Sequence, residues 1–149
     1  MQRDALVLLL ALSLQAASRS SGGPSVDLCE VLANPSAYDQ KELTITAGYR
    51  AGYEWQEFSC FTCSTREKVW VELGPEVKGV SKIGKAKRFD QMYRVTFVGI
   101  FEGGHRYGHM AGYAFQFRVT EVKAAKLLWK LGHGATQIPE QIKAKACQK

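Results

Sequence analysis

Cysteine is the residue type in this chain with the clearest capacity for chemistry. The chain holds four cysteines, and two of them form the segment Cys60-Phe-Thr-Cys63. Two thiols at this spacing can form and exchange a disulfide, or bind a metal ion as thiolates. A redox pair of this kind needs its first cysteine at a helix N-terminus, whereas this pair closes an aromatic, strand-like segment. We therefore expect structural disulfides, with metal binding and thiol exchange as the alternatives.

A zinc site would need ligands in addition to Cys60 and Cys63. His105 and His109 have the separation that brings two imidazoles together on one face of a helix. Four neighbouring glycines disfavour a helix in this segment, so we expect a hairpin loop that carries two ordinary histidines. The sequence predicts no metal site, and these four residues are the candidate ligands if a metal ion is bound.

The sequence contains no recognisable set of catalytic residues. It lacks a glycine-rich phosphate loop, a serine nucleophile motif and a paired-carboxylate motif. Glu54 and Glu57 are the best acidic pair, and we expect both to be surface charges. We therefore predict no catalytic residues and no cofactor.

Aromatic side chains gather on the strands around the cysteine pair. The candidate ligand-binding residues are Tyr49, Tyr53, Trp55, Phe58 and Trp70. Exposed aromatic rings bind ligands by stacking, whereas buried rings contribute to a core. We expect these residues to form a binding face, with core packing as the alternative for each ring.

Most of the candidate cysteines and aromatic residues lie in segments that are predicted to be strands. Alternating apolar and polar residues predict strands over 41–51, 68–73, 92–101 and 113–119. A bend at Ala51-Gly52 predicts one further strand that runs back toward the cysteine pair. The connection from Glu76 to Gln91 is rich in Lys and Gly, so we expect a long surface loop with at most one helical turn.

Helical spacing is expected near both ends of the chain. A short helix with an apolar side is capped by Ser25 and ended by Pro35. The apolar residues from Val122 to Trp129 also recur at helical spacing, and Pro139 opens another short helix. We therefore divide the mature chain into a domain over 26–123 and a helical tail over 124–149.

The N-terminal segment Met1–Ser18 has the composition of a secretory signal peptide. An apolar run from Ala5 to Leu14 is followed by small residues, which predicts cleavage after Ser18. The following segment, 19–25, should be a flexible lead-in. We expect an exported protein, periplasmic or extracellular, without stable insertion in the membrane after cleavage.

The order of the predicted elements matches a small, mainly β, five-stranded Greek-key barrel of the OB type, with a short N-terminal helix and a C-terminal helix. An α+β antiparallel sheet is the alternative. The segment NPSAYDQKELTITAGYRAGYEW resembles the opening of small exported bacterial OB-fold-like proteins of unknown function, although Gln40 replaces their usual Gly. GHMAGYAFQFRV resembles their last hairpin. The resemblance spans about Val26 to Lys123 and implies a non-catalytic binding module.

The disulfide pairing follows from the N-terminal helix and from this resemblance, which places Cys29 beside the strand of the CxxC pair. The helix must be pinned against the barrel, so we expect Cys29 to bond to Cys60 or to Cys63. The remaining thiol is then available for Cys147.

The formal net charge is +6, which indicates partners of opposite charge. Lys and Arg cluster over 78–94 and again over 123–149, although such clusters are also typical of solvated loops and helix faces. We expect the partner to be a protein, an envelope component or an anionic ligand. The alternatives are a zinc-binding or thiol-disulfide exchange protein, and a protein that binds single-stranded nucleic acid or polyanions, against which export argues.

Overall fold

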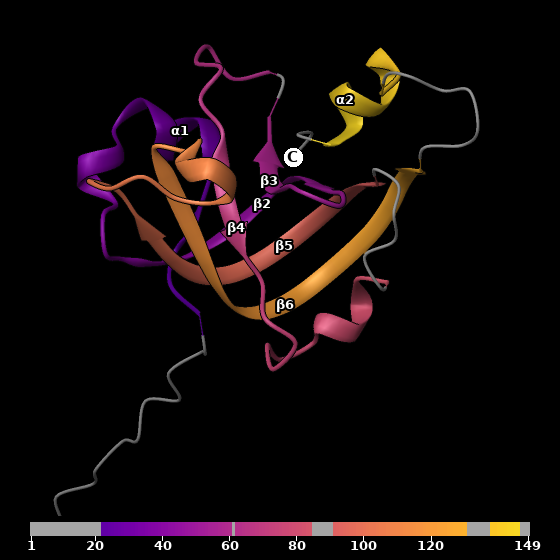
Figure 1. The fold of residues 1–149 in the computed structure, drawn as a ribbon, viewed down its shortest axis with the longest axis horizontal. Coiled ribbons are helices and arrows are strands. Elements are labelled where there is room, and N and C mark those ends of the chain that lie inside the picture. The colour runs from indigo at the N-terminus through magenta and orange to yellow at the C-terminus, as the bar shows by residue number, and fades with distance from the viewer. Residues whose placement is uncertain (1–21, 61, 85–90, 131–137, 147–149) are drawn as a thin grey trace, which may run out of the picture.

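The structure, a computed structural model, describes residues 22–60, 62–84, 91–130 and 138–146. Within these ranges the chain forms a curved, closed β-sheet with short helices at its periphery (Figure 1). The strands are β1 (Ser25–Val26), β2 (Glu42–Ala51), β3 (Gln56–Ser59), β4 (Val69–Glu72), β5 (Gln91–Glu102) and β6 (Phe115–Lys130). The helices are α1 (Leu28–Ala33), η1 (Pro35–Ala37), η2 (Val80–Lys82), η3 (His109–Ala111) and α2 (Glu140–Ala146).

Strands β2 to β6 close into an OB-like barrel, as predicted. The order along the sheet is β1-β2-β3-β4-β6-β5, and an additional pairing of β2 with β5 closes it. Neighbouring barrel strands are antiparallel except for β4 and β6, which are parallel. The α+β sheet that we considered as the alternative is therefore not the fold.

The barrel interior holds the alternating apolar residues of each strand. Tyr49 and Phe58 project inward beside Phe97, and the ring centroids of Tyr49 and Phe97 lie 5.4 Å apart. Helix α1 adds Leu28 and Val31 to the same core, at 2% and 0% exposed. The inward side chains of the strands and the apolar side of α1 thus pack in one core. Because side chains alternate along a strand, the intervening residues of each strand face outward.

The predicted helix from Val122 to Trp129 is wrong, because β6 continues as a strand to Lys130. β6 pairs with β5 over its whole length, but three register shifts interrupt the ladder. Each shift leaves an extra residue on β6, so the inward face passes from Val119 to Val122 to Ala125. A bulged strand therefore produces the three-residue spacing that we read as a helix. The helical tail accordingly does not begin at position 124.

The N-terminal prediction also needs correction. The N-cap of α1 is Asp27, whose side chain accepts a hydrogen bond from the Cys29 N–H at 2.7 Å, and Ser25 lies in β1. β1 runs parallel to the start of β2, and the Thr44 N–H donates to the carbonyl oxygen of Pro24 at 2.9 Å. The described end of the expected flexible lead-in, 22–25, is therefore attached to the barrel.

The C-terminal helix begins after Pro139, as expected, and forms α2. Its last residue, Ala146, is 0% exposed and contacts β2 at Gly48. A methyl group at Gly48 would approach the carbonyl oxygen of Ser59 to 2.4 Å and the Cβ of Ala146 to 2.8 Å. The absence of a side chain at position 48 is therefore what lets α2 reach the outer surface of the barrel.

A disulfide joins Cys29 of α1 to Cys63 in the β3–β4 connection, with an S–S distance of 2.08 Å. It confirms that Cys29 bonds to the CxxC pair and selects Cys63. The fourth cysteine, Cys147, and the predicted signal peptide lie outside the described residues. Among the residues that are described, no helix is both long enough and apolar enough to cross a membrane.

Loss of this disulfide should lower the stability of the barrel. The two cysteines are 34 residues apart, and closing a loop of this length contributes about 3–4 kcal/mol in the chain-entropy model. Cys63→Ser, made together with Cys60→Ser so that the nearby Cys60 thiol cannot bond to Cys29 instead, should therefore lower the free energy of unfolding by about that amount, measured by urea denaturation under oxidising conditions. Cys60→Ser is the matched control because it keeps the Cys29–Cys63 bond. An equal loss in both variants would show that the pairing is wrong.

Candidate functional site

Two of the five predicted ligand-binding aromatics belong to the core. Tyr49 and Phe58 are each 1% exposed and make ring contacts inside the barrel. They alternate inward on β2 and β3, so their rings are not available to stack on a ligand from the outside. For these two residues core packing, our alternative reading, is the correct one.

The other three predicted aromatics lie together at one end of the outer surface. They line a groove of about 580 Å³ with residues of three segments: Gly52, Tyr53, Glu54, Trp55, Gln56, Trp70, Gly108 and His109. Residues 52–55 connect β2 to β3, Trp70 is on β4, and 108–109 belong to the connection between β5 and β6. Tyr53 is 83% exposed, whereas both tryptophans are half-buried. We call this hollow the aromatic groove.

Trp55 has a defined position in the short β2–β3 connection. The Gly52 N–H donates to the carbonyl oxygen of Trp55 at 2.8 Å, which closes the turn. The guanidinium of Arg50 on β2 lies 4.9 Å from the centre of the Trp55 ring, within cation–π distance. The turn and this cation together hold one wall of the groove.

Trp70 forms the opposite wall and is held by the β5–β6 connection. Its ring lies 5.3 Å from that of Tyr113, and backbone hydrogen bonds between Tyr107 and Tyr113 close this loop. Gly108 has a φ of 69°, and a methyl group there would come within 2.5 Å of the Trp70 ring. Glycine is therefore required at this point, both for the backbone and for the close approach.

Glu57 lies next to these walls and is not the surface charge that we expected, because it is only 1% exposed. One carboxylate oxygen accepts from Lys68 at 3.0 Å and lies 3.7 Å from Arg50. The other accepts from the Tyr113 hydroxyl at 2.7 Å. In the sheet Glu57 is opposite both Arg50 and Trp70, so the carboxylate links both walls of the groove.

Burial, and then the hydrogen bond to Glu57 and its negative charge, raise the pKa of the Tyr113 hydroxyl. The phenol is therefore neutral at physiological pH and acts as a hydrogen-bond donor. Sequence reasoning missed Arg50, Glu57 and Tyr113. The alternation over 43–50 assigned Arg50 to the outer face, and Glu57 was expected to be a surface charge. No local pattern indicated that the loop carrying Tyr113 covers Glu57 and buries it.

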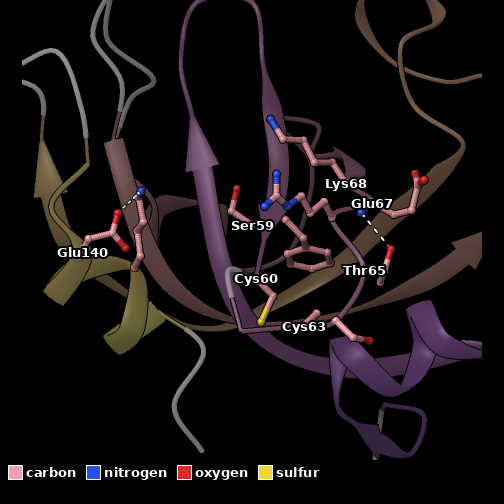
Figure 2. A pocket seen from close by; sticks show the side chains of 11 residues that line it. Ser59, Cys60, Cys63, Thr65, Glu67, Lys68 and Glu140 are labelled. Carbon is pink, nitrogen blue, oxygen red and sulfur yellow. Dashed lines mark hydrogen bonds and ion pairs between the residues drawn. The ribbon is translucent and has the colours of Figure 1, made fainter.

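Three sulfur atoms form a second cluster. The Sγ of Cys60 lies 3.7 Å from the Sγ of Cys29, and the ligand atoms of Cys29, Cys60 and Cys63 all lie within 4.8 Å of one another. Cys60 and Cys63 border a pocket of about 620 Å³ that Arg66, Lys68, Glu140 and Lys143 also line. Figure 2 shows Cys60 and Cys63 near each other, with Glu140 of α2 across the pocket.

The predicted histidine ligands do not join this cluster. In the part of the chain that the structure describes, the one group of three or more potential metal-ligating residues is Cys29, Cys60 and Cys63. His105 is exposed and lies 6.3 Å from the Tyr107 ring, and His109 lines the aromatic groove. Cys60 and Cys63 thus remain candidate ligands, whereas His105 and His109 both lie in the β5–β6 connection, His109 at the start of η3.

A third hollow, of about 460 Å³, lies at the end of the barrel against the β4–β5 connection. Its walls are largely apolar and include Leu73, Val80 and Ile83. The Tyr49 hydroxyl lines it and donates to the Oε1 of Gln56 at 3.1 Å.

The described lysines of the basic middle segment have partners on β6. Lys78 forms an ion pair with Glu121 at 3.0 Å, and this contact lowers the pKa of the Glu121 carboxyl. Lys82 donates to the carbonyl oxygens of Val122 and Lys123 at 3.0 and 2.9 Å. These side chains attach η2 to the barrel, which reduces the positive charge available to a polyanion.

Comparisons of the chain with protein-family models, with curated proteins and with solved structures gave no match.

Removing the charge of Glu57 should destabilise the outer face. Glu57→Gln takes away the carboxylate that Lys68 and Tyr113 share, so we expect the free energy of unfolding to fall by about 1–3 kcal/mol. The pKa of Tyr113 should also fall toward its ordinary value of 10.0, because the negative acceptor is gone. Urea denaturation and ultraviolet titration of the phenol test both effects.

The matched control for this experiment is Glu72→Gln on β4. Glu72 is exposed and accepts a hydrogen bond from Gln116 at 3.2 Å, so it offers a carboxylate on the same face of the sheet without the burial of Glu57. Its replacement should change stability by less than about 0.5 kcal/mol. Equal effects of the two substitutions would contradict a special role for the buried carboxylate.

Proposed function

We propose that this chain is an exported, non-catalytic OB-like binding module and that its ligand binds in the aromatic groove. The observation that carries the proposal is the convergence of Tyr53, Trp55 and Trp70 on one open hollow. The strands of these residues correspond to the outer face that OB folds commonly use for ligands, together with the loops at its end. The predicted signal peptide and the resemblance to exported OB-fold-like proteins support export.

The side chains of the groove suit a ligand with ring-shaped apolar faces and hydroxyl groups. Tyr53, Trp55 and Trp70 offer aromatic surfaces, and Glu54, Gln56 and His109 offer hydrogen-bonding groups beside them. A sugar has both features, and an exported protein meets sugars in the cell envelope. We therefore propose an envelope glycan as the ligand.

Two observations make a single-stranded nucleic acid the less favourable ligand for this groove. Glu54 is one of the lining residues and adds a negative charge. The guanidinium of Arg50, next to Trp55, lies 3.7 Å from the Glu57 carboxylate, which offsets its positive charge. A groove that follows a nucleic-acid backbone needs an excess of positive charge. Lys78 and Lys82 contact β6 instead, as described above.

The tryptophans provide the test. Soluble glycan fragments from digested bacterial cell wall should change the intrinsic fluorescence of the full chain, and Trp55→Ala and Trp70→Ala should each weaken binding about tenfold. Loss of one stacking ring costs on the order of 1–3 kcal/mol. Trp129→Ala is the matched control, because Trp129 is a half-buried tryptophan on β6 that does not line the groove.

The same titration with a single-stranded oligonucleotide separates the two ligand classes. We expect weak binding that is lost as salt rises, since it would depend on general positive charge. Glycan binding that is unchanged in both groove variants would contradict the proposed site. Tight oligonucleotide binding that depends on Trp55, with no glycan binding, would contradict the proposed ligand.

A further inference from the structure

The three sulfur atoms of the second cluster have nearly the spacing of ligands around one metal ion. Metal–thiolate bonds of about 2.3 Å place three sulfurs around one ion about 4 Å apart. Cys60 Sγ is 3.7 Å from Cys29 Sγ, and no pair in the cluster exceeds 4.8 Å. Cys29 and Cys63 are joined by a disulfide, and this bond must open before both sulfurs can bind an ion.

The backbone positions of the cluster are set by elements that do not depend on this bond. Cys29 is in the first turn of α1, whose neighbours Leu28 and Val31 are buried in the core. Cys60 directly follows β3, where Phe58 and Ser59 are buried and paired with β2. When the disulfide opens, these elements therefore hold two of the three thiols close together, and Cys63 is only three residues from Cys60.

An ion can reach the cluster from solvent. All three cysteines are half-buried, and the pocket of about 620 Å³ borders Cys60 and Cys63. A divalent ion with three thiolates carries one excess negative charge. The same pocket is lined by three cationic side chains and two carboxylates, and the excess of positive charge favours the thiolate form: Arg66, Lys68 and Lys143 against Glu67 and Glu140.

We propose that Cys29, Cys60 and Cys63 form a redox-gated site for a soft metal ion. A dithiol reductant first transfers two electrons to the Cys29–Cys63 bond, which gives two thiols and leaves the reductant as a disulfide. The three thiols then bind one Zn²⁺ or Cu⁺ as thiolates and release their protons. Three sulfur ligands select soft ions over Mg²⁺ and Ca²⁺. This site is separate from the aromatic groove, so a negative result for metal binding would not affect the proposed glycan binding, and the reverse also holds.

The test uses Cd²⁺ as the probe, because a cadmium–thiolate bond has a charge-transfer absorption in the ultraviolet. It is done on the full chain with Cys147→Ser, so that the cluster contains all of the remaining cysteines. After reduction by a dithiol and its removal under anaerobic conditions, the chain should bind one equivalent of Cd²⁺. The oxidised chain should show no such band.

Single substitutions then assign the ligands. Cys29→Ser, Cys60→Ser and Cys63→Ser should each reduce the band by about a third and weaken Cd²⁺ binding at least tenfold, while His105→Ala and His109→Ala should have no effect. Cys60→Ser is the most informative, because it retains the disulfide and can be checked for native folding before reduction. Near-ultraviolet circular dichroism follows folding of each reduced chain.

Several results would overturn the proposal. One is a reduced chain that stays folded but shows no cadmium–thiolate band. Another is a full band in Cys60→Ser. A third is a reduced chain that loses its near-ultraviolet signal and does not regain it with Cd²⁺, because the cluster would then not survive opening of the disulfide.

Discussion

Pairing of β2 with β5 is the constraint on which the rest of this molecule depends. It joins Glu42–Ala51 to Gln91–Ile100 without a register shift and so converts a sheet into a closed barrel. Closure requires strong curvature, which the three register shifts between β5 and β6 supply by bending β6 around the core (Figure 1). The buried aromatic rings of Tyr49, Phe58 and Phe97 fill the space that this closure creates.

The closed barrel also decides where chemistry is available. With apolar side chains inside, the alternate positions on β2, β3 and β4 place Arg50, Glu57 and Trp70 in one outward row. The β5–β6 connection folds over this row through Tyr113 and Gly108, which buries the carboxylate and leaves Trp70 half-buried in the groove wall. At the opposite border of the same strands, α1 and the segment after β3 bring the three sulfurs together.

Local periodicity was sufficient for most strands and for the barrel, since alternation over 43–49 or 113–119 has no competing interpretation. It failed where nonlocal pairing changes the period, as in β6, where bulges imitate the spacing of a helix. Local periodicity could not show which aromatic residues belong to the core and which line the groove. Tyr49 and Trp55 are both aromatic residues, and they differ in the residues that surround them in the fold. The burial of Glu57 depends on a loop 56 residues away, a contact that no local pattern reports. For Cys29 the sequence left two possible disulfide partners, Cys60 and Cys63, and the structure shows that the partner is Cys63.

Chemical-shift mapping by two-dimensional NMR tests the central claim most directly, namely that this barrel presents one ligand groove between the β2–β3 and β5–β6 connections. Soluble cell-wall glycan fragments would be titrated into the isotope-labelled, oxidised chain. Shifts should concentrate at the amides of 52–56 and 108–109 and at the indole N–H groups of Trp55 and Trp70, and Trp129 should be unaffected. Shifts centred on Ser64–Lys68 or on Leu73–Gly84 would place the ligand in another hollow and would contradict binding in the aromatic groove.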